Sequence, residues 1–280
     1  MIPAAAVFSA GLTAHSGPSV PGASPGTTPA ALAVSPFRAT ALDDAPLLLE
    51  QSYRLRYSVY CLERKFLRQE DYPQGLETDA YDSLSVHVGA VDASGKLFGT
   101  ARLVNVPVGG PDLPLLGHCS LFADHAELYD PANKVIEVSR LAMGRSSTWG
   151  LHHGGFKRRD MREMVFRTLL KAIYQGAKRL EATHWVAAIE KSLQRRVEEY
   201  GFPFRAIGPE SDYSGPVAPY LMSLQEFDQV ILSRRIPMLA EFLVGLEPQF
   251  QPRPDRTWEG VVFGKSSGRG HLSERIVAGL

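Results

Sequence analysis

Net charge is absent from this sequence of 280 residues, because its 30 basic and 30 acidic side chains balance. A nucleic-acid binder usually presents a strongly basic surface, so the composition argues against that class of partner. Cysteine is scarce as well, and Cys61 and Cys119 show neither metal-site spacing nor a disulfide framework. His152 and His153 are adjacent rather than helically spaced, so we expect no metal site. The scarcity of cysteine favours a reducing, cytoplasmic compartment.

Long apolar runs are also missing. A membrane-spanning helix needs about 20 mostly apolar residues, whereas the best run here, Ile236 to Leu246, is shorter and contains Glu241. The first residues lack the basic start and continuous apolar core of a signal peptide, and Gly11 and Pro18 interrupt them. We therefore expect no secretion, and membrane contact, if any, would be peripheral.

The first 37 residues contain no charged side chain and are dominated by Ala, Ser, Pro, Gly and Thr. Such a segment cannot bury enough apolar surface to offset the entropy lost on ordering. The sequence thus predicts a flexible low-complexity tail at 1–40, one folded domain at 41–235, and a C-terminal helix with an extended arm at 236–280.

Hydrophobic periodicity predicts an α/β domain in the central part. The expected order is a helix, two strands joined by a hairpin, a short helix, a third strand, a long helix, then a strand, a helix and two strands. Antiparallel strands followed by a strand, helix and strand unit give a mixed central sheet flanked by helices on both faces. The expected ranges are 45–60, 84–92, 97–106, 120–128, 134–143, 160–180, 183–189, 191–200, 203–207 and 220–224.

A polar loop at 61–82 ends in an acidic triplet, Glu77, Asp79 and Asp82. Loops of this length in a compact domain are usually functional. Acidic loop residues taken alone are more often merely solvated, so the triplet gains meaning only from the residues that accompany it.

A set of spaced residues gives the triplet a context. Arg56 and Tyr60 lie on the first helix, Phe66 follows them, Arg102 closes the sequence Gly-Thr-Ala-Arg, and the third strand contains Glu137, Ser139 and Arg140. In this order and spacing the residues resemble the signature of the acyl-homoserine-lactone (autoinducer) synthases. Tyr60 and Phe66 depart from that signature, which usually has Phe and Trp at these places, so the acceptor stays open.

The later part of the chain is similar to the exosortase (PEP-CTERM) system-associated acyltransferases and the N-acyl amino acid synthases. The resemblance is carried by Tyr200-Gly201-Phe202, Ile207-Gly208-Pro209, Asp212-Tyr213 and Ala218-Pro219-Tyr220. It implies a GNAT-like acyltransferase fold with no permanently bound cofactor. The Arg/Gln-x-x-Gly-x-Gly/Ala loop of the CoA-dependent relatives is missing between Met143 and Asp160. The resemblance then favours a donor carried as acyl-phosphopantetheine on acyl carrier protein.

Acyl transfer from a thioester to an amine needs a base for the amine proton and donors for the oxyanion. Glu137, Glu77 and Ser139 are the catalytic candidates, with Glu137 as the favoured base. Strand alternation would place Glu137 and Ser139 on one sheet face and Arg140 on the other. The expected substrate-binding residues are Arg56, Tyr60, Phe66, Asp79, Asp82, Arg102 and Arg140, of which Arg140 would brace the acidic loop.

Nine basic and three acidic residues lie between Arg145 and Glu181. This surplus fits either a solvated helix face or a docking surface for an acidic carrier protein and its phosphate. The docking candidates, at or before the helix start, are Arg145, Lys157, Arg158 and Arg159.

Three functions remain open from the sequence. The first is an N-acyltransferase that moves a fatty acyl group from acyl carrier protein to the amino group of an amino acid or similar small amine. The second is an acyl-homoserine-lactone synthase that uses S-adenosylmethionine. The third is a non-catalytic acyl-carrier or lipid-binding protein with the same fold.

Overall fold

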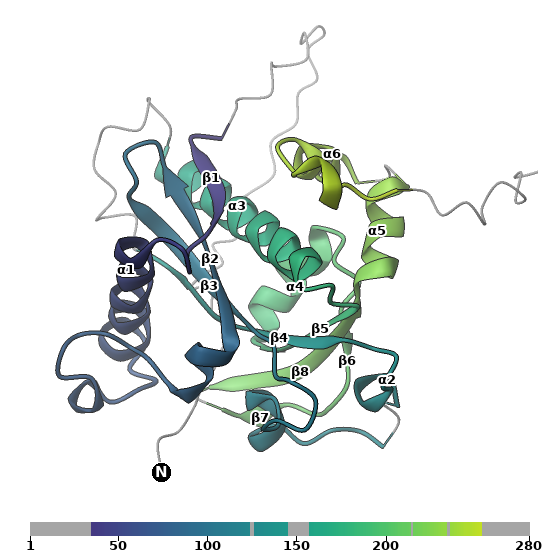
Figure 1. Cartoon of the computed structure of the whole chain (residues 1–280), viewed down its shortest axis with the longest axis horizontal. Coiled ribbons are helices and arrows are strands. Elements are labelled where there is room, and N and C mark those ends of the chain that lie inside the picture. Colours follow the sequence, from purple (N-terminus) through teal and green to yellow (C-terminus); the bar gives the residue numbers. More distant parts are fainter. Residues whose placement is uncertain (1–34, 124–125, 145–156, 214, 234–235, 254–280) are drawn as a thin grey trace, which may run out of the picture.

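A mixed sheet of eight strands forms the centre of the computed structural model (Figure 1). The structure describes residues 35–123, 126–144, 157–213, 215–233 and 236–253. The strand order is β1-β2-β3-β4-β5-β8-β6, and β7 pairs with β8. The strands are β1 (Phe37–Ala41), β2 (Ser85–Asp92), β3 (Leu97–Val104), β4 (Val135–Met143), β5 (His184–Ile189), β6 (Arg205–Ala206), β7 (Ser211–Asp212) and β8 (Pro216–Ser223).

Strands β4 and β5 are the parallel pair in this otherwise antiparallel sheet. Their register runs from Val135 opposite His184 to Glu137 opposite Val186, and stops there. Strand β4 continues to Met143 and β5 to Ile189, so the two strands are not paired with each other over their second halves. The sheet is thus split just beyond Glu137.

Helices cover both faces of the sheet, which confirms the predicted fold class (Figure 1). Helix α3 packs on β1, β2 and β3, and its core cluster also takes in α4, α5 and α6. Helix α1 and the π-helix that continues it contribute to the clusters on the opposite side. The helices are α1 (Pro46–Tyr57), the π-helix (Ser58–Glu63), α2 (Ala126–Tyr129), α3 (Arg158–Arg179), α4 (Lys191–Glu199), α5 (Leu224–Leu232) and α6 (Pro237–Leu243).

Helix α3 lies close against the strands because the sequence leaves room for it. A side chain at Gly99 on β3 would meet Leu169 of the helix at 2.6 Å. Leu169 and the neighbouring Val165 are fully buried. Because protein interiors are densely packed, even one added methyl group at Gly99 would push the helix away from the sheet.

A bulge interrupts β4 at Arg140. Between two register pairs, Thr100 opposite Ala142 and Arg102 opposite Ser139, β4 advances by one residue more than β3. Arg140 takes up the extra residue with φ of 52°, in the left-handed region that non-glycine residues seldom adopt. Such strain persists only where the surroundings hold it in place.

Several boundaries differ from those expected. Strand β1 pairs with β2 over residues 37–41, so the folded part starts inside the segment expected to be a tail. The short helix expected at 120–128 lies at Ala126–Tyr129, and the last strand starts earlier, at Pro216. The expected arm after residue 253 lies outside the described residues. None of the described helices is both long and apolar enough to span a membrane.

Candidate functional site

Three arginines and three carboxylates close into a ring of alternating charge inside the domain. Each arginine binds two of the carboxylates, and each carboxylate lies between two arginines. All six side chains are at most 8% exposed. The contacts of this ion-pair ring are Arg56–Glu77 (2.5 Å), Glu77–Arg140 (3.0 Å), Arg140–Asp79 (2.8 Å), Asp79–Arg102 (2.5 Å), Arg102–Asp82 (3.0 Å) and Asp82–Arg56 (2.7 Å).

Local structure fixes the acidic side of the ring. Asp79 caps the 3-10 helix Ala80–Leu84, because its side chain accepts a hydrogen bond from the Tyr81 N–H at 2.9 Å. In return, the Asp82 side chain accepts a hydrogen bond from the Asp79 N–H at 2.8 Å. This reciprocal capping box holds two carboxylates at a fixed separation before they meet the arginines. The third acid, Glu77, is anchored through its backbone N–H to the carbonyl of Tyr53 on α1.

Every carboxylate oxygen of the ring accepts at least one hydrogen bond from the protein. For Glu77, one oxygen binds Arg140 Nε and the other binds Arg56 Nε. The oxygens of Asp79 bind Arg102 and Arg140, and those of Asp82 bind Arg56, Arg102 and His87. An acceptor ammonium ion would therefore compete with the arginines for these oxygens.

The arginines keep the three acids ionised. Burial alone would raise the pKa of Glu77, but the charges of Arg140 and Arg56 outweigh it and leave that pKa below its usual value. For Asp79, burial is likewise outweighed by Arg102 and Arg140. For Asp82, burial is outweighed by the hydrogen bond from His87 and by Arg56, so its pKa is lowered strongly. Strongly paired acids of this kind are poor proton acceptors at neutral pH.

The bulge overturns the expectation that Arg140 faces away from Ser139. Arg102, the register partner of Ser139, donates from Nε to its Oγ at 3.3 Å, and the same guanidinium shares Asp79 with Arg140. The extra residue in β4 shifts the alternation of side chains, so Arg140 lies on the same face of the sheet as Ser139. Glu137, Ser139 and Arg140 thus serve one site.

Arg102 has an unused donor. Its Nη2 has no hydrogen-bond partner among the described residues, although the side chain is fully buried. Because Nε and Nη2 lie on one edge of a guanidinium, this donor is on the edge that faces Ser139. A buried donor without an acceptor costs free energy, which a ligand oxygen in this position would recover.

Glu137 lies outside the ion-pair ring, and its pKa shifts in the opposite direction from those of the ring acids. It is 1% exposed, and its Oε2 accepts the Leu115 N–H at 2.7 Å. Burial raises the pKa of Glu137 to about 7, although the Leu115 hydrogen bond and the charge of Arg102 act against the rise. A carboxyl that is half ionised near neutral pH is well suited to take up and release a proton.

The two aromatic candidates lie at the split in the sheet. The buried Tyr60 donates its hydroxyl hydrogen to the Leu141 carbonyl at 2.9 Å, and the half-buried Phe66 ring lies 6.5 Å from the Tyr60 ring. Leu141 belongs to the half of β4 that is not paired with β5. Tyr60 therefore holds the strand just after the bulge.

The backbone around Met143 faces the split. The Gly144 N–H donates to Phe98 on β3, so by strand alternation the Met143 N–H points to the other side, toward β5. No β5 residue is paired there. The Met143 N–H thus faces the space between the two strands.

The structure adds a residue that the sequence did not single out, His87 on β2. The ring lies between Asp82 and Asp43, at 3.1 Å and 2.9 Å from the two nitrogens. A lone histidine in an alternating strand carries little signal, because its carboxylate partners come from two distant segments.

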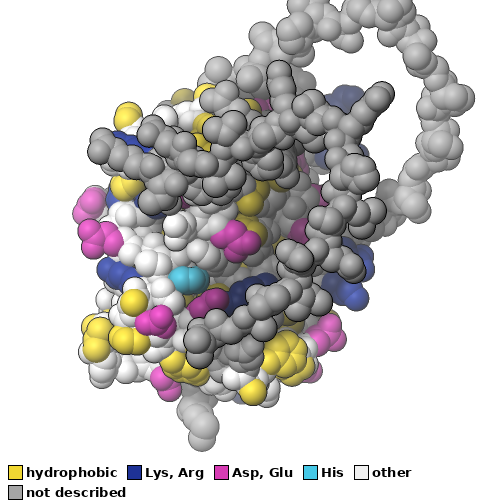
Figure 2. Space-filling model, turned by 90° about the vertical axis from the view of Figure 1, so that its right-hand side faces the viewer, with side chains coloured by type: hydrophobic (Ala, Val, Ile, Leu, Met, Phe, Trp, Pro, Cys, Tyr) yellow, Lys and Arg dark blue, Asp and Glu magenta, His cyan; other side chains and the backbone are white. Residues whose placement is uncertain are grey.

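The basic surplus of helix α3 is partly used inside the protein. Arg167 pairs with Glu241 of α6, Lys178 with Asp228 of α5, and Arg179 with Glu247. Of the four docking candidates, Lys157 and Arg159 are exposed, the side chain of Arg158 is not described, and Arg145 lies outside the described residues. On the face shown in Figure 2, acidic and basic side chains are interspersed.

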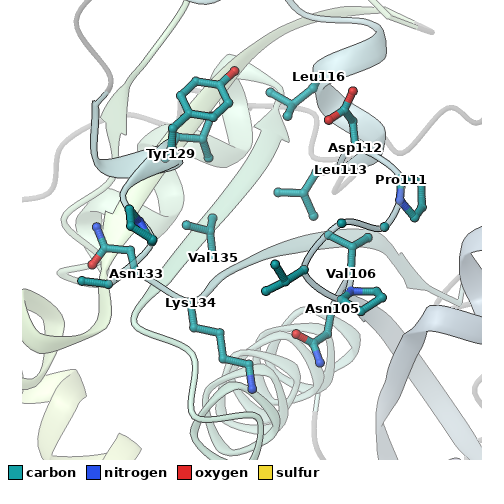
Figure 3. Close-up of a pocket in the computed structure, with 17 residues that line it drawn as sticks. Asn105, Val106, Pro111, Asp112, Leu113, Leu116, Tyr129, Asn133, Lys134 and Val135 are labelled. Carbon is teal, nitrogen blue, oxygen red and sulfur yellow. The ribbon is translucent and has the colours of Figure 1, made fainter.

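A hollow of about 680 Å³ lies where β3 ends and β4 begins (Figure 3). Val106, Leu113, Leu116 and Val135 form apolar parts of its wall, and Lys134 lies at its rim. The residues of the ion-pair ring and Glu137 do not line it. Leu115, whose N–H binds Glu137, lies in the same turn as Leu116 of the hollow's wall.

Thiol and metal chemistry find no support in the described part of the chain. Cys61 and Cys119 are both free and buried, and burial raises the pKa of each thiol to about 11. No group of three or more His, Cys, Asp or Glu residues there is arranged to hold a metal ion.

Comparison with known proteins places this site in context. Residues 55–146 match the family described as acetyltransferase (GNAT) domain. This match includes the whole ion-pair ring, Glu137 and Ser139. No curated protein matches the chain.

Three solved structures are among those to which this chain is similar. The CoA-dependent acyl-homoserine lactone synthase BjaI, with SAM and isopentyl-CoA, is 19% identical, with 72% of this chain and 90% of BjaI covered and a TM-score of 0.46. FeeM, an N-acyl amino acid synthase from uncultured soil microbes, is 16% identical, with 74% and 96% covered and a TM-score of 0.46. TofI in an apo form is 20% identical, with 76% and 99% covered and a TM-score of 0.49.

Proposed function

We propose that this chain, an acyltransferase with an acetyltransferase (GNAT) domain over residues 55–146, moves a fatty acyl group from acyl carrier protein to the amino group of an amino acid or similar small amine. The observation that carries the proposal is Glu137, a buried carboxyl with a pKa of about 7 beside the split between β4 and β5. A site without chemistry would have no evident need for such a group.

The reaction forms one bond and breaks one. The amine nitrogen attacks the thioester carbon, a tetrahedral oxyanion forms, and the carbon–sulfur bond then breaks to give the amide and the thiol. In our proposal Glu137 accepts the proton that the amine loses, directly or through water, and the thiolate recovers a proton as it leaves. No covalent enzyme intermediate is needed.

Two donors are placed to serve the substrate oxygens. We assign the Met143 N–H to the developing oxyanion, because it faces the split between the strands. We assign Arg102 Nη2, next to Ser139, to a substrate oxygen such as the carboxylate of an amino acid acceptor. Because both donors are already fixed by the protein, little reorganisation would accompany the reaction.

The ion-pair ring has a supporting role in this proposal. Each acid already lies between two buried arginines, so we assign Glu77, Asp79 and Asp82 to holding the arginines in place rather than to taking up the amine. Tyr60 and Phe66 would border the acceptor near Leu141. Glu77 is then a positioning residue and not a proton acceptor.

We assign the donor to acyl carrier protein on the sequence between Met143 and Asp160, which lacks the CoA-type loop. The exposed Lys157 and Arg159 at the start of α3 would meet the acidic carrier. Helix N–H groups at the same point favour a phosphate.

One experiment tests the proposal. The purified chain is incubated with long-chain acyl carrier protein, long-chain acyl-CoA, a pool of amino acids and S-adenosylmethionine, and the products are identified by mass spectrometry. An N-acyl amino acid formed from the carrier-bound donor is the expected result. An acyl-homoserine lactone would replace the proposal with the second function, and product from acyl-CoA alone would overturn the choice of donor.

A further inference from the structure

The imidazole of His87 joins two carboxylates that come from different parts of the chain. Its Nε2 lies 3.1 Å from Oδ1 of Asp82, and its Nδ1 lies 2.9 Å from Oδ1 of Asp43. The Asp43 carboxylate also accepts the backbone N–H of His87 at 3.0 Å. His87 itself is 2% exposed, so protein groups rather than solvent surround the imidazole.

The geometry sets the protonation of the ring. An ionised carboxylate can only accept hydrogen bonds, so each imidazole nitrogen must donate if both contacts are to be favourable. Asp82 is held ionised by Arg56 and Arg102, and Asp43 is open to solvent on one side. A neutral imidazole would turn one lone pair toward a carboxylate at hydrogen-bond distance. The doubly protonated form is therefore the one that fits.

The groups around His87 act on its charge in both directions. Arg102 lies opposite it across β2 and β3, and Arg56 approaches through Asp82, so two cations oppose its charge. Tyr53 of α1 meets the ring edge-on at 5.5 Å between centroids. Burial favours the neutral form, yet the hydrogen bonds to Asp43 and Asp82 outweigh it and raise the pKa of His87.

This contact reaches the proposed chemistry in two steps. The Asp82 oxygen that binds His87 also binds Arg102 Nη1. The Nε of the same guanidinium donates to Ser139, and its Nη2 is the unused donor. Loss of the His87 bond would let Asp82 turn and Arg102 follow it. Asp43 lies two residues after the end of β1, outside the range of the family match, so the N-terminal strand supports the site as well.

We propose that Asp43 and doubly protonated His87 form a supporting bridge that positions Asp82, and through it Arg102, for acyl transfer. His87 is a positioning residue in this proposal, which rests on the proposed function for its effect on turnover. The bridge gives the enzyme an alkaline limit, because a neutral His87 no longer donates to both carboxylates.

The test combines a structural readout with kinetics on the full chain. Nitrogen-15 NMR of the histidine side chains, with the His87 signals assigned by their loss in His87→Gln, should show both ring nitrogens protonated at pH 7. Asp43→Asn changes a carboxylate that is 37% exposed, and it should lower the pH at which His87 loses one of its two ring protons. A singly protonated His87 at pH 7 would overturn the bridge.

Kinetics separate positioning from mere stability. His87→Gln keeps a neutral donor and should lower kcat about 10- to 100-fold, the equivalent of one charge-assisted hydrogen bond, with the KM for the donor little changed. In Asp43→Asn the alkaline limb of kcat should move to lower pH, while the control His184→Gln on β5 should match the wild type. Wild-type kcat and pH profile in both bridge variants would refute the positioning role. A doubly protonated His87 in a chain that transfers no acyl group would support the bridge and count against the proposed function.

Discussion

Arg140 and Glu77, 63 residues apart in the chain, form a 3.0 Å ion pair in which both side chains are fully buried. The pair joins the bulge of β4 to the loop before β2. Removal of either member leaves the other charged and buried, which is far more costly than loss of a surface pair.

A double-mutant cycle should reveal this dependence. Arg140→Met and Glu77→Gln should each lower the free energy of unfolding by about 3–5 kcal/mol, while the double variant should lose clearly less than the sum. Urea unfolding measures all four proteins. The exposed pair Arg54 and Glu50 is the matched control, and its cycle should give a coupling of about 0.5 kcal/mol or less. Additive losses at the buried pair would contradict the ring.

Glu137→Gln should lower kcat by at least about 100-fold, because the amide cannot take up a proton. The wild-type kcat should rise with pH through a pKa near 7 as Glu137 ionises, and the variant should lose that limb. The pH profile of kcat measures both effects. Unchanged turnover would remove Glu137 from the mechanism.

The same substitution should change how stability depends on pH. The pKa of Glu137 is raised from 4.5 to about 7 in the folded chain, so between these values the unfolded state ionises first and stability falls as pH rises. Full ionisation costs about 3 kcal/mol by pH 8. Relative to the wild type, Glu137→Gln should gain about that much between pH 5 and pH 8 in urea unfolding. An equal pH dependence in the two proteins would show that burial does not perturb this group.

Tyr60→Phe should lower the free energy of unfolding by about 1–2 kcal/mol, because the buried Leu141 carbonyl loses its donor while the ring stays in place. Tyr81→Phe is the control, since its hydroxyl donates to the Asp112 carbonyl in an exposed position and should matter less than about 0.5 kcal/mol. Equal losses in the two variants would show that the bond to Leu141 has no special weight. Thermal or urea unfolding decides between these outcomes.

Reversal of charge at Arg158 and Arg159 should raise the KM for acyl carrier protein and leave kcat nearly unchanged, and the effect should shrink as salt is added. Steady-state kinetics at two ionic strengths test this expectation. Arg195→Glu, on the exposed side of α4, is the control. A KM that does not respond to the reversal would remove the docking surface.

The sequence predicts the fold well where periodicity is strong. The hairpin of β2 and β3, the strand β4 and the long helix α3 lie within a few residues of their expected ranges. Strand β1 has only five residues, and its pairing with β2 is a long-range contact that no local pattern reveals. Tertiary pairing decides such short strands.

The site was predictable in its members more than in its geometry. The sequence singled out Arg56, Arg102 and Arg140 together with the acidic triplet, and the structure joins these six residues in one ring. The bulge at Arg140 could not be foreseen, because the residue is neither glycine nor asparagine and takes a conformation rare for arginine. The Leu115 N–H that binds Glu137 is a backbone group, which leaves no trace in the sequence.

The closed form of the ion-pair ring also limits how this protein can change over time. Each of its six members pairs with two others, so any single replacement leaves two buried charges with one ring partner instead of two. A descendant sequence can leave this arrangement only by several simultaneous substitutions or through a poorly folded intermediate. The ring should therefore be inherited as a block, while the residues that border the acceptor remain free to diversify.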